Sequence, residues 1–138
     1  ERAGSERLIH MHGELRKARC ECCGAVFSWT QDLSSGTRCR ACGEIGGMRP
    51  HIVWFGEFPF EMEAIMNALK SADIFLCIGT SGVVYPAAGF ARQAAERADC
   101  HLIEMNIERT EISRHFHEHI VGPVSVELPK LVLRLLSA

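Results

Sequence analysis

The stretch DIFLCIGTSG, residues 73–82, decides the fold that we expect for this chain. Its apolar run from Ile74 to Ile78 is uninterrupted, which is typical of a strand buried in a parallel sheet. The run ends in Gly-Thr-Ser-Gly, a set of small residues that favours a turn. We therefore expect a buried parallel strand, followed by the kind of turn at which open α/β sheets bind their ligands.

The neighbouring segments continue an alternation of helices and strands. Residues 61–71 place four apolar side chains at the spacing of an amphipathic helix, namely Met62, Ile65, Met66 and Leu69. Pro86 can open a second helix in its first turn. Residues 101–107, HLIEMNI, predict a second buried strand, and residues 127–138 predict a closing amphipathic helix. This rhythm predicts the α/β class with a parallel sheet.

A second decisive pattern consists of two C-x-x-C pairs. Cys20 and Cys23 form the first pair and Cys39 and Cys42 the second, with fifteen residues between them. This spacing is typical of a tetrahedral site in which four thiolates bind zinc. Residues 18–48 contain few large apolar side chains and cannot build a core of their own. We therefore expect a structural zinc ion, because four thiolates leave no coordination position open for water.

Three further cysteines do not fit the pairs. Cys22 breaks the spacing and is the expected spare thiol, although pairing of Cys22 with Cys20 or with Cys23 stays open as an alternative. Cys77 and Cys100 lie in apolar surroundings and are expected to be inert core residues. Metal-binding cysteines indicate a reducing compartment, so we expect the cytoplasm.

Small and polar residues end both predicted strands. Gly79, Thr80 and Ser81 follow the first strand, while Asn106 and Glu108 follow the second within EMNIE. Together they favour a nucleotide site beyond the carboxyl ends of the strands, where polar side chains can bind ribose hydroxyls. The alternative is a pair of plain strand-to-helix turns. Because the G-x-G-x-x-G fingerprint is absent, we expect ribose or adenine here rather than pyrophosphate.

Histidines gather in two places. Residues 8–12, LIHMH, alternate and predict an extended segment that ends at Gly13. His12 is the catalytic candidate, since a histidine at a strand end can titrate near neutral pH, with a structural role as the alternative. Residues 115–119, HFHEH, lack the H-E-x-x-H order of zinc proteases, so a solvated helix face is the preferred interpretation.

Two apolar segments have two interpretations. Residues 53–57, VWFGE, and residues 83–86, VVYP, are apolar and bounded by Gly or Pro. Packing in the core is the default expectation, and residues 52–55 in particular predict a buried strand. The alternative is a pair of open edges that clamp an extended peptide by strand addition.

Composition excludes several classes of protein. The 138 residues carry a net charge of −2 and show no stripe of Arg and Lys, so no nucleic-acid partner is expected. No apolar run approaches the roughly 18 residues of a membrane span. The N-terminus lacks the layout of a secretory signal.

Five motifs in one order make the chain closely resemble the C-terminal part of the sirtuins, which are NAD-dependent protein-lysine deacylases: IHMHGEL, the double C-x-x-C, RPHIVWFGE, GTSGVVYPAAGF and EMNIE. Two of them are most similar to the bacterial type and to the mitochondrial desuccinylase branch. The resemblance implies the C-terminal half of a Rossmann-like parallel sheet with helices, plus a small zinc-ribbon module. It also implies transfer of an acyl group from lysine to ADP-ribose with release of nicotinamide.

The resemblance further implies roles for matched residues. His12 matches the catalytic general base that acts on the nicotinamide ribose. The four paired cysteines match the structural zinc ligands. The implied NAD contacts are Gly79, Thr80, Ser81, Asn106, Ile107, Glu108 and Val124. The implied contacts to the acyl-lysine peptide are Val53, Phe55, Gly56, Glu57, Val84 and Tyr85.

Three parts follow from these roles: residues 1–17 with the catalytic histidine, residues 18–48 with zinc, and residues 49–138 as the Rossmann-like part that binds NAD and peptide. The Gly-Ala-Gly-x-Ser phosphate loop, the flexible cofactor loop and the Gln-Asn-Ile-Asp motif of the sirtuins do not occur in this sequence. We therefore expect a fragment that needs the upstream half of its domain as a partner to complete the reaction. The alternative is a non-catalytic module that binds zinc and a nucleotide or peptide.

Overall fold

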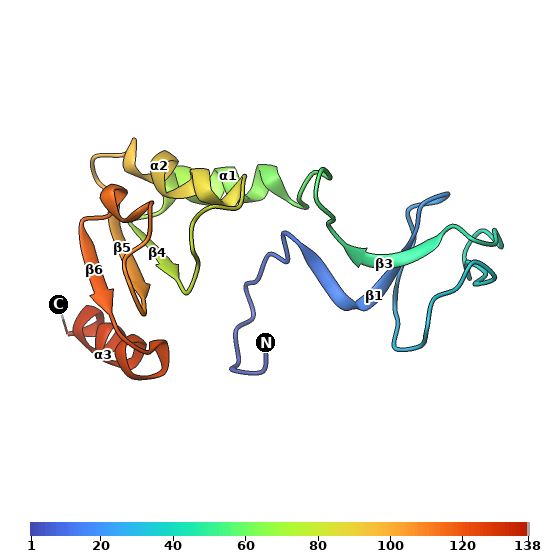
Figure 1. Ribbon diagram of the computed structural model, residues 1–138, viewed down its shortest axis with the longest axis horizontal. Helices are drawn as coiled ribbons and strands as arrows, with labels where there is room; N and C mark the ends of the chain where they lie inside the picture. The colour runs from blue at the N-terminus through green and yellow to red at the C-terminus, as the bar shows by residue number, and fades with distance from the viewer. Residues whose placement is uncertain (138) are drawn as a thin grey trace. The chain divides into compact units, whose positions relative to one another are not determined.

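The computed structural model describes residues 1–137, which group into two compact units, one from Glu1 to Ile65 and the other from Met66 onward. Helix α1 (Met62–Ser71) contains the boundary between them. Each unit has a sheet of its own (Figure 1). The sequence predicts three parts that differ in function, residues 1–17, 18–48 and 49–138. The two units are defined by compactness instead, so the three-part division stays a prediction.

The first unit is built on a three-stranded antiparallel sheet. Strand β1 (Gly13–Cys20) lies between β2 (Val26–Ser28) and β3 (Met48–Ile52). Its small core contains Ala18, Cys20, Cys39 and Met48, with Phe27, Trp29 and Leu33 packed against it. Two of the four buried residues of this core are cysteines, so thiols supply part of its packing.

One strand prediction in this unit is wrong. Residues 52–55 do not form a buried strand, because β3 ends at Ile52 and Phe55 is 99% exposed. Residues 8–12, predicted as an extended segment, precede β1, which begins at Gly13. After Ile52 the chain turns, with the amide of Glu57 donating to the carbonyl of Trp54 at 3.0 Å, so the apolar residues point away from any core.

The second unit contains the parallel sheet that the sequence predicts. Strands β4 (Ile74–Ile78), β5 (His101–Asn106) and β6 (Glu118–Val121) pair in that order, all parallel. Strand β5 is fully buried at Leu102 and Ile103, whereas β4 is half-exposed. The expected burial is therefore confirmed for β5 and wrong for β4, because β4 forms an edge of the sheet in the described chain.

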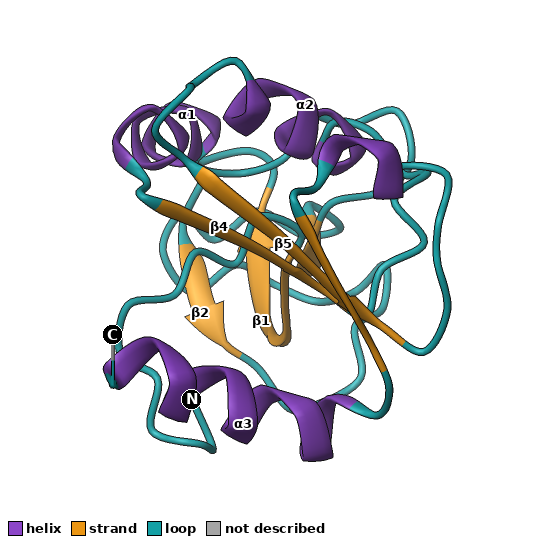
Figure 2. Cartoon of the chain, turned by 90° about the vertical axis from the view of Figure 1, so that its left-hand side faces the viewer, coloured by secondary structure: helices purple, strands orange, loops and turns teal. Residues whose placement is uncertain are grey.

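Helices cover both faces of this sheet. The short helix η1 (Ala87–Gly89) leads into α2 (Phe90–Ala95), and α3 (Val124–Leu136) lies on the opposite side of the strands (Figure 2). Helix α3 packs Leu131 against Ile103 and Met105, and Leu76, Ile120, Val124 and Leu128 complete this cluster. Within residues 1–137, no helix has the length and apolar character needed to cross a membrane.

The helix predicted for residues 115–119 is wrong. The short helix η2 (Ser113–His115) ends where that segment begins, and β6 incorporates His119. Nδ1 of His119 lies 3.0 Å from Oε2 of Glu104, and Nδ1 of His117 accepts the amide of Leu102 at 3.1 Å. These histidines bind groups on β5, so pairing with the neighbouring strand overrides the helical spacing.

Candidate functional site

The structure brings together the four cysteines predicted as metal ligands. The sulfurs of Cys20, Cys23, Cys39 and Cys42 all lie within 4.8 Å of one another. The Sγ atoms of Cys20 and Cys42 are 3.7 Å apart, as are those of Cys23 and Cys39. A tetrahedral zinc ion with Zn–S bonds of about 2.3 Å separates its sulfurs by about 3.8 Å, so these two distances match those of a zinc site.

The two cysteine pairs form turns with the same hydrogen-bond pattern. In the first, the amide of Cys20 donates to the carbonyl of Ala25 and the amide of Gly24 to that of Cys20, both at 2.9 Å. In the second, the amide of Cys39 donates to Glu44 at 2.8 Å and that of Gly43 to Cys39 at 3.0 Å. Both glycines have a positive φ, +74° and +79°, which only glycine adopts without strain. Each turn thus directs its two cysteine sulfurs toward the centre of the four-sulfur cluster.

The electrostatics of the cluster favour a cation. The amides of Cys42 and Ala41 donate toward the sulfur of Cys39 and hold the pKa of that thiol at about 6. At Cys42 the amide of Glu44 has a lowering effect, but burial and the neighbouring thiols raise the pKa to about 12. The sulfurs are therefore too close to ionise together unless a positive ion lies between them.

Cys22 lies apart from this set. Among the described residues its sulfur does not belong to the four-cysteine group, and it packs instead against Gly47, where an added Cβ would lie 2.8 Å from it. Burial raises the pKa of the Cys22 thiol, as does the adjacent Cys20. The geometry agrees with the expectation that Cys22 is the spare thiol.

His12 lies at the turn that leads into β1. Its side chain is exposed, and its backbone carbonyl accepts a hydrogen bond from the amide of Val53 at 3.0 Å. The next residue, Gly13, has φ +84° and no room for a Cβ beside the His51 carbonyl of β3. The catalytic candidate is thus joined by main-chain contacts to the first of the candidate peptide-binding residues.

An arginine that sequence reasoning missed supports the segment Val53–Glu57. Arg49 is only 8% exposed, and its guanidinium binds both carboxylate oxygens of Glu57, at 2.5 and 3.1 Å. Glu57 also accepts the amide of Trp54 at 2.9 Å, and the guanidinium lies 3.4 Å from the centroid of the Trp54 ring. The hydrogen bonds from Arg49 and from the Trp54 amide lower the pKa of Glu57 to about 2. This carboxylate therefore binds the protein's own turn.

The candidate nucleotide residues other than Val124 line one cavity in the second unit. Its volume is about 350 Å³, and its walls come from the turn after β4 and the turn after β5: Gly79, Thr80, Ser81, Val83, Asn106, Ile107, Glu108, Arg109, Thr110 and Glu111. Nδ2 of Asn106 donates to the carbonyl of Thr80 at 2.8 Å and ties the two turns together. The amide of Gly79 donates to Met105 at 3.0 Å.

Three predicted site residues lie elsewhere in the second unit. Val124 opens α3 and packs against the core instead of lining the cavity. Val84 and Tyr85 are exposed, Tyr85 by 74%, in the segment that precedes η1. The predicted peptide contacts therefore come from both units, with Val53, Phe55, Gly56 and Glu57 in the first.

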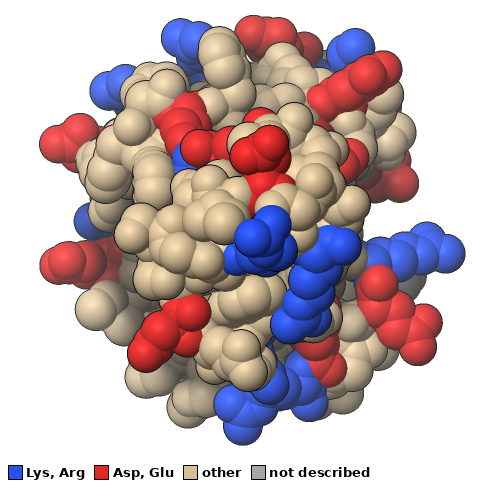
Figure 3. All heavy atoms as spheres, turned by 90° about the vertical axis from the view of Figure 1, so that its right-hand side faces the viewer, with Lys and Arg blue, Asp and Glu red and all other residues tan. Residues whose placement is uncertain are grey.

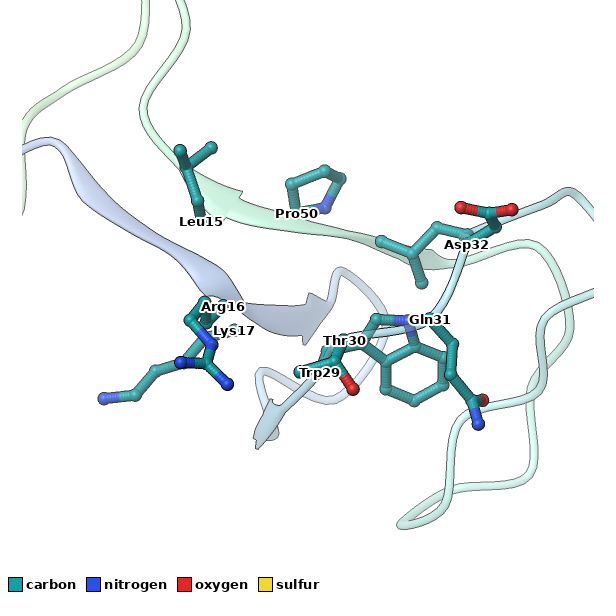
Figure 4. A pocket seen from close by; sticks show the side chains of 9 residues that line it. Leu15, Arg16, Lys17, Trp29, Thr30, Gln31, Asp32 and Pro50 are labelled. Carbon is teal, nitrogen blue, oxygen red and sulfur yellow. The ribbon is translucent and has the colours of Figure 1, made fainter.

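The first unit has a further open hollow of about 630 Å³ (Figure 4). One wall is formed by Leu15, Arg16 and Lys17 of β1, and the other by residues 29–33, with Pro50 of β3 between them. Its mixed lining does not indicate a particular chemistry. The face shown in Figure 3 carries both acidic and basic side chains, in keeping with a net charge of −2.

Comparison with known proteins gives consistent results. The model of the Sir2 family matches residues 1–86. The chain is 51% identical over 136 residues to an NAD-dependent protein deacylase of Bdellovibrio bacteriovorus and 47% identical over 137 residues to one of Escherichia coli K12. Each alignment covers 99% of this chain, but only 57% and 49% of the relative. The chain thus spans about half the length of the curated relatives that it matches.

Solved structures show the same fold. A crystal structure of a Sir2 homologue in complex with NAD superposes with a TM-score of 0.85 at 31% identity, covering 99% of this chain and 54% of that one. The structure of Sir2Af2 bound to a myristoylated histone peptide superposes with a TM-score of 0.76 at 32% identity, covering 99% and 61%.

Proposed function

Because this chain belongs to the Sir2 family, we propose that it forms part of an NAD-dependent enzyme that removes acyl groups from lysine side chains of proteins. The observation that carries the proposal is the cavity between the turns after β4 and β5, which contains the small and polar side chains expected to contact NAD. The relatives named NAD-dependent protein deacylase support this activity, as does the solved complex of a homologue with NAD.

In this proposal the cavity binds the adenosine half of NAD. Asn106 and Glu108 offer polar groups to ribose hydroxyls, while Gly79 lets the backbone approach the nucleotide closely. The Asn106 amide is already oriented by its bond to Thr80, so little ordering is required on binding. When bound, NAD would supply an electrophilic ribose carbon as the acceptor of the acyl group.

His12 is the proposed general base. A neutral imidazole accepts a proton from a hydroxyl at near-neutral pH, and the exposure of His12 leaves its ring accessible to a bound ribose. The hydrogen bond from Val53 to its carbonyl fixes the backbone position of this histidine.

The acyl-lysine peptide is the proposed protein partner. Its proposed contacts are Val53, Phe55, Gly56 and Glu57 of the first unit, and Val84 and Tyr85 of the second. The exposure of Phe55 and Tyr85 supports this role, because apolar side chains with no core to join are typical of recognition surfaces. The neighbouring structure that holds a myristoylated histone peptide gives further support.

Zinc has a structural role in this proposal. Four thiolates complete its tetrahedral shell, so the chain offers no position at which the metal would bind water or substrate. The metal would hold the turns at Cys20–Gly24 and Cys39–Gly43 against the sheet of the first unit, which lacks a large apolar core.

The test is deacylation of an acyl-lysine peptide by the full-length protein with and without NAD. His12→Asn should lower kcat by about 100-fold or more, the scale of general base catalysis. His10→Asn is the matched control, since His10 lies two residues away near the carboxylates of Glu1 and Glu14, at 3.7 Å from each. Full activity in His12→Asn would disprove the assignment of the base. Binding of NAD and peptide without turnover would instead support the non-catalytic module.

A further inference from the structure

A buried carboxylate in the second unit has no part in the function proposed so far. Glu104 lies in the middle of β5 and is 3% exposed. In the sheet it pairs with Cys77 of β4 on one side and His119 of β6 on the other. Because burial of a charged group is costly unless its oxygens are hydrogen-bonded, the partners of Glu104 indicate why it is there.

Two of these partners follow β5 in the chain: Thr110 lies in the loop after it, and Ser113 is the first residue of η2. Oε1 of Glu104 accepts the hydroxyl of Thr110, and Oε2 accepts the hydroxyl of Ser113, both at 2.5 Å. The Ser113 oxygen in turn accepts the amide of Thr110 at 2.8 Å. A single carboxylate thus holds both the middle and the end of the segment 107–113.

The third partner anchors the carboxylate itself. Nδ1 of His119 on β6 lies 3.0 Å from Oε2 of Glu104, so the group is held between two strands of the sheet. Burial alone raises the pKa of the Glu104 carboxyl, but the hydrogen bonds from Ser113, Thr110 and His119 outweigh it and lower the pKa. The carboxylate therefore stays ionised and accepts hydrogen bonds with both oxygens at neutral pH.

The segment that Glu104 holds is one wall of the proposed nucleotide cavity. Ile107, Glu108, Arg109 and Thr110 line that cavity, and Asn106 at the end of β5 ties it to the opposite wall. Apart from Thr110, these cavity residues make no hydrogen bond to Glu104, whose side chain is buried and does not line the cavity.

We propose that Glu104 is a positioning residue for the nucleotide: through Thr110 and Ser113 it fixes the loop 107–113 so that Asn106 and Glu108 face the adenosine ribose. The inference rests on the proposed binding of NAD at this cavity. It assigns a role to the first residue of the EMNIE motif, whereas the resemblance to the sirtuins gave roles only to the last three.

The experiment measures binding of ADP-ribose to the full-length protein by calorimetry, well below the melting temperature of each variant. Ser113→Ala and Glu104→Gln should each raise the Kd for ADP-ribose by about 10-fold, the scale of one hydrogen bond to a charged group. The double variant should bind no more weakly than the weaker single variant, because both changes break the same link. KM for the acyl-lysine peptide should stay unchanged.

The matched control is Glu118→Gln. Glu118 lies on β6, and both its oxygens bind Arg134 of α3, at 2.6 and 2.8 Å, with no hydrogen bond to residues 107–113 in the described part of the chain. This variant should lose some thermal stability and keep its affinity for ADP-ribose. Hydrogen exchange of the amides 107–113 should accelerate in Ser113→Ala and not in Glu118→Gln.

Two outcomes would overturn the inference in distinguishable ways. If the wild-type protein binds ADP-ribose and the Glu104 and Ser113 variants bind it equally well with lower melting temperatures, Glu104 only stabilises the fold. If the wild-type protein does not bind ADP-ribose, the proposed nucleotide site is wrong, and so is the proposed role of Glu104 in positioning the nucleotide.

Discussion

Arg49 and Glu57 form a bidentate ion pair, Nη1 to Oε1 at 2.5 Å and Nη2 to Oε2 at 3.1 Å, at the turn that contains Trp54 and Phe55. The pair closes this turn onto β3, because Glu57 also accepts the Trp54 amide and Arg49 also donates to the carbonyl of Ile52 at 3.3 Å. The ion pair between Arg49 and Glu57 thus fixes the turn that carries the proposed peptide contacts.

Replacement of Arg49 should therefore weaken peptide binding. Arg49→Lys keeps the charge but loses the paired geometry, so we expect KM for the acyl-lysine peptide to rise about 10-fold with little change in KM for NAD. Steady-state kinetics of the full-length protein measure both constants. Arg16→Lys, at an exposed position on β1, is the control and should behave like the wild type. Equal changes in the two KM values would contradict the assignment.

The same pair predicts a dependence of stability on pH. The pKa of Glu57 is lowered from 4.5 to about 2 in the folded protein, so its contribution to stability is complete above pH 4.5 and is lost as the pH falls toward 2. The difference in unfolding free energy between the wild type and Glu57→Gln should be constant from neutral pH down to 4.5 and shrink below it. Denaturant titrations across this range measure it, and loss of zinc in acid affects both proteins alike.

The cysteine assignments predict different outcomes for neighbouring thiols. Cys39→Ser should abolish binding of one zinc ion per chain and unfold the region around residues 18–48, because the free energy of metal binding there, about 10 kcal/mol or more, is also folding free energy. Cys22→Ser should keep the zinc. Metal analysis and circular dichroism distinguish the two, and a chelator should reproduce the effect of Cys39→Ser. Loss of zinc in Cys22→Ser would reverse the choice of spare thiol.

A glycine next to the proposed base predicts a local stability effect. Gly13→Ala should cost about 2 kcal/mol or more, because its φ of +84° disfavours alanine and a Cβ would clash with the backbone of His51. Gly24→Ala separates the two causes, since Gly24 has φ +74° but no atom within 4 Å of an added Cβ. Its cost should be nearer 1 kcal/mol in chemical denaturation.

The parallel sheet could be predicted because residues 74–78 form an uninterrupted apolar run and residues 101–107 contain mostly apolar side chains. These two segments correspond to β4 and β5. The cysteine spacing likewise implied one cluster, since two C-x-x-C turns form locally whatever surrounds them. Strand β6 was not predicted, because it is short and two of the four residues in EHIV are polar. The spacing of the histidines in residues 115–119 favoured a helix there instead.

The partners of buried charges could not be predicted in the same way. Arg49 and Glu104 look like ordinary polar residues within strands, and their roles depend on groups that folding brings close, such as Glu57 and Ser113. The antiparallel sheet of the first unit was missed for a related reason. Its strands carry Arg, Lys and Pro in place of an alternating apolar pattern, and its core depends on cysteines.

The hydrogen bond between the amide of Val53 and the carbonyl of His12 has a mechanical consequence. Val53 belongs to the segment proposed to bind the peptide, and His12 is proposed to accept the proton. The two residues are 41 positions apart in the sequence, yet they are hydrogen-bonded to each other. A substrate that displaces the turn Val53–Glu57 would also displace His12, the proposed base, through this hydrogen bond. An ill-fitting peptide would then be turned over slowly as well as bound weakly, and selectivity would be visible in kcat.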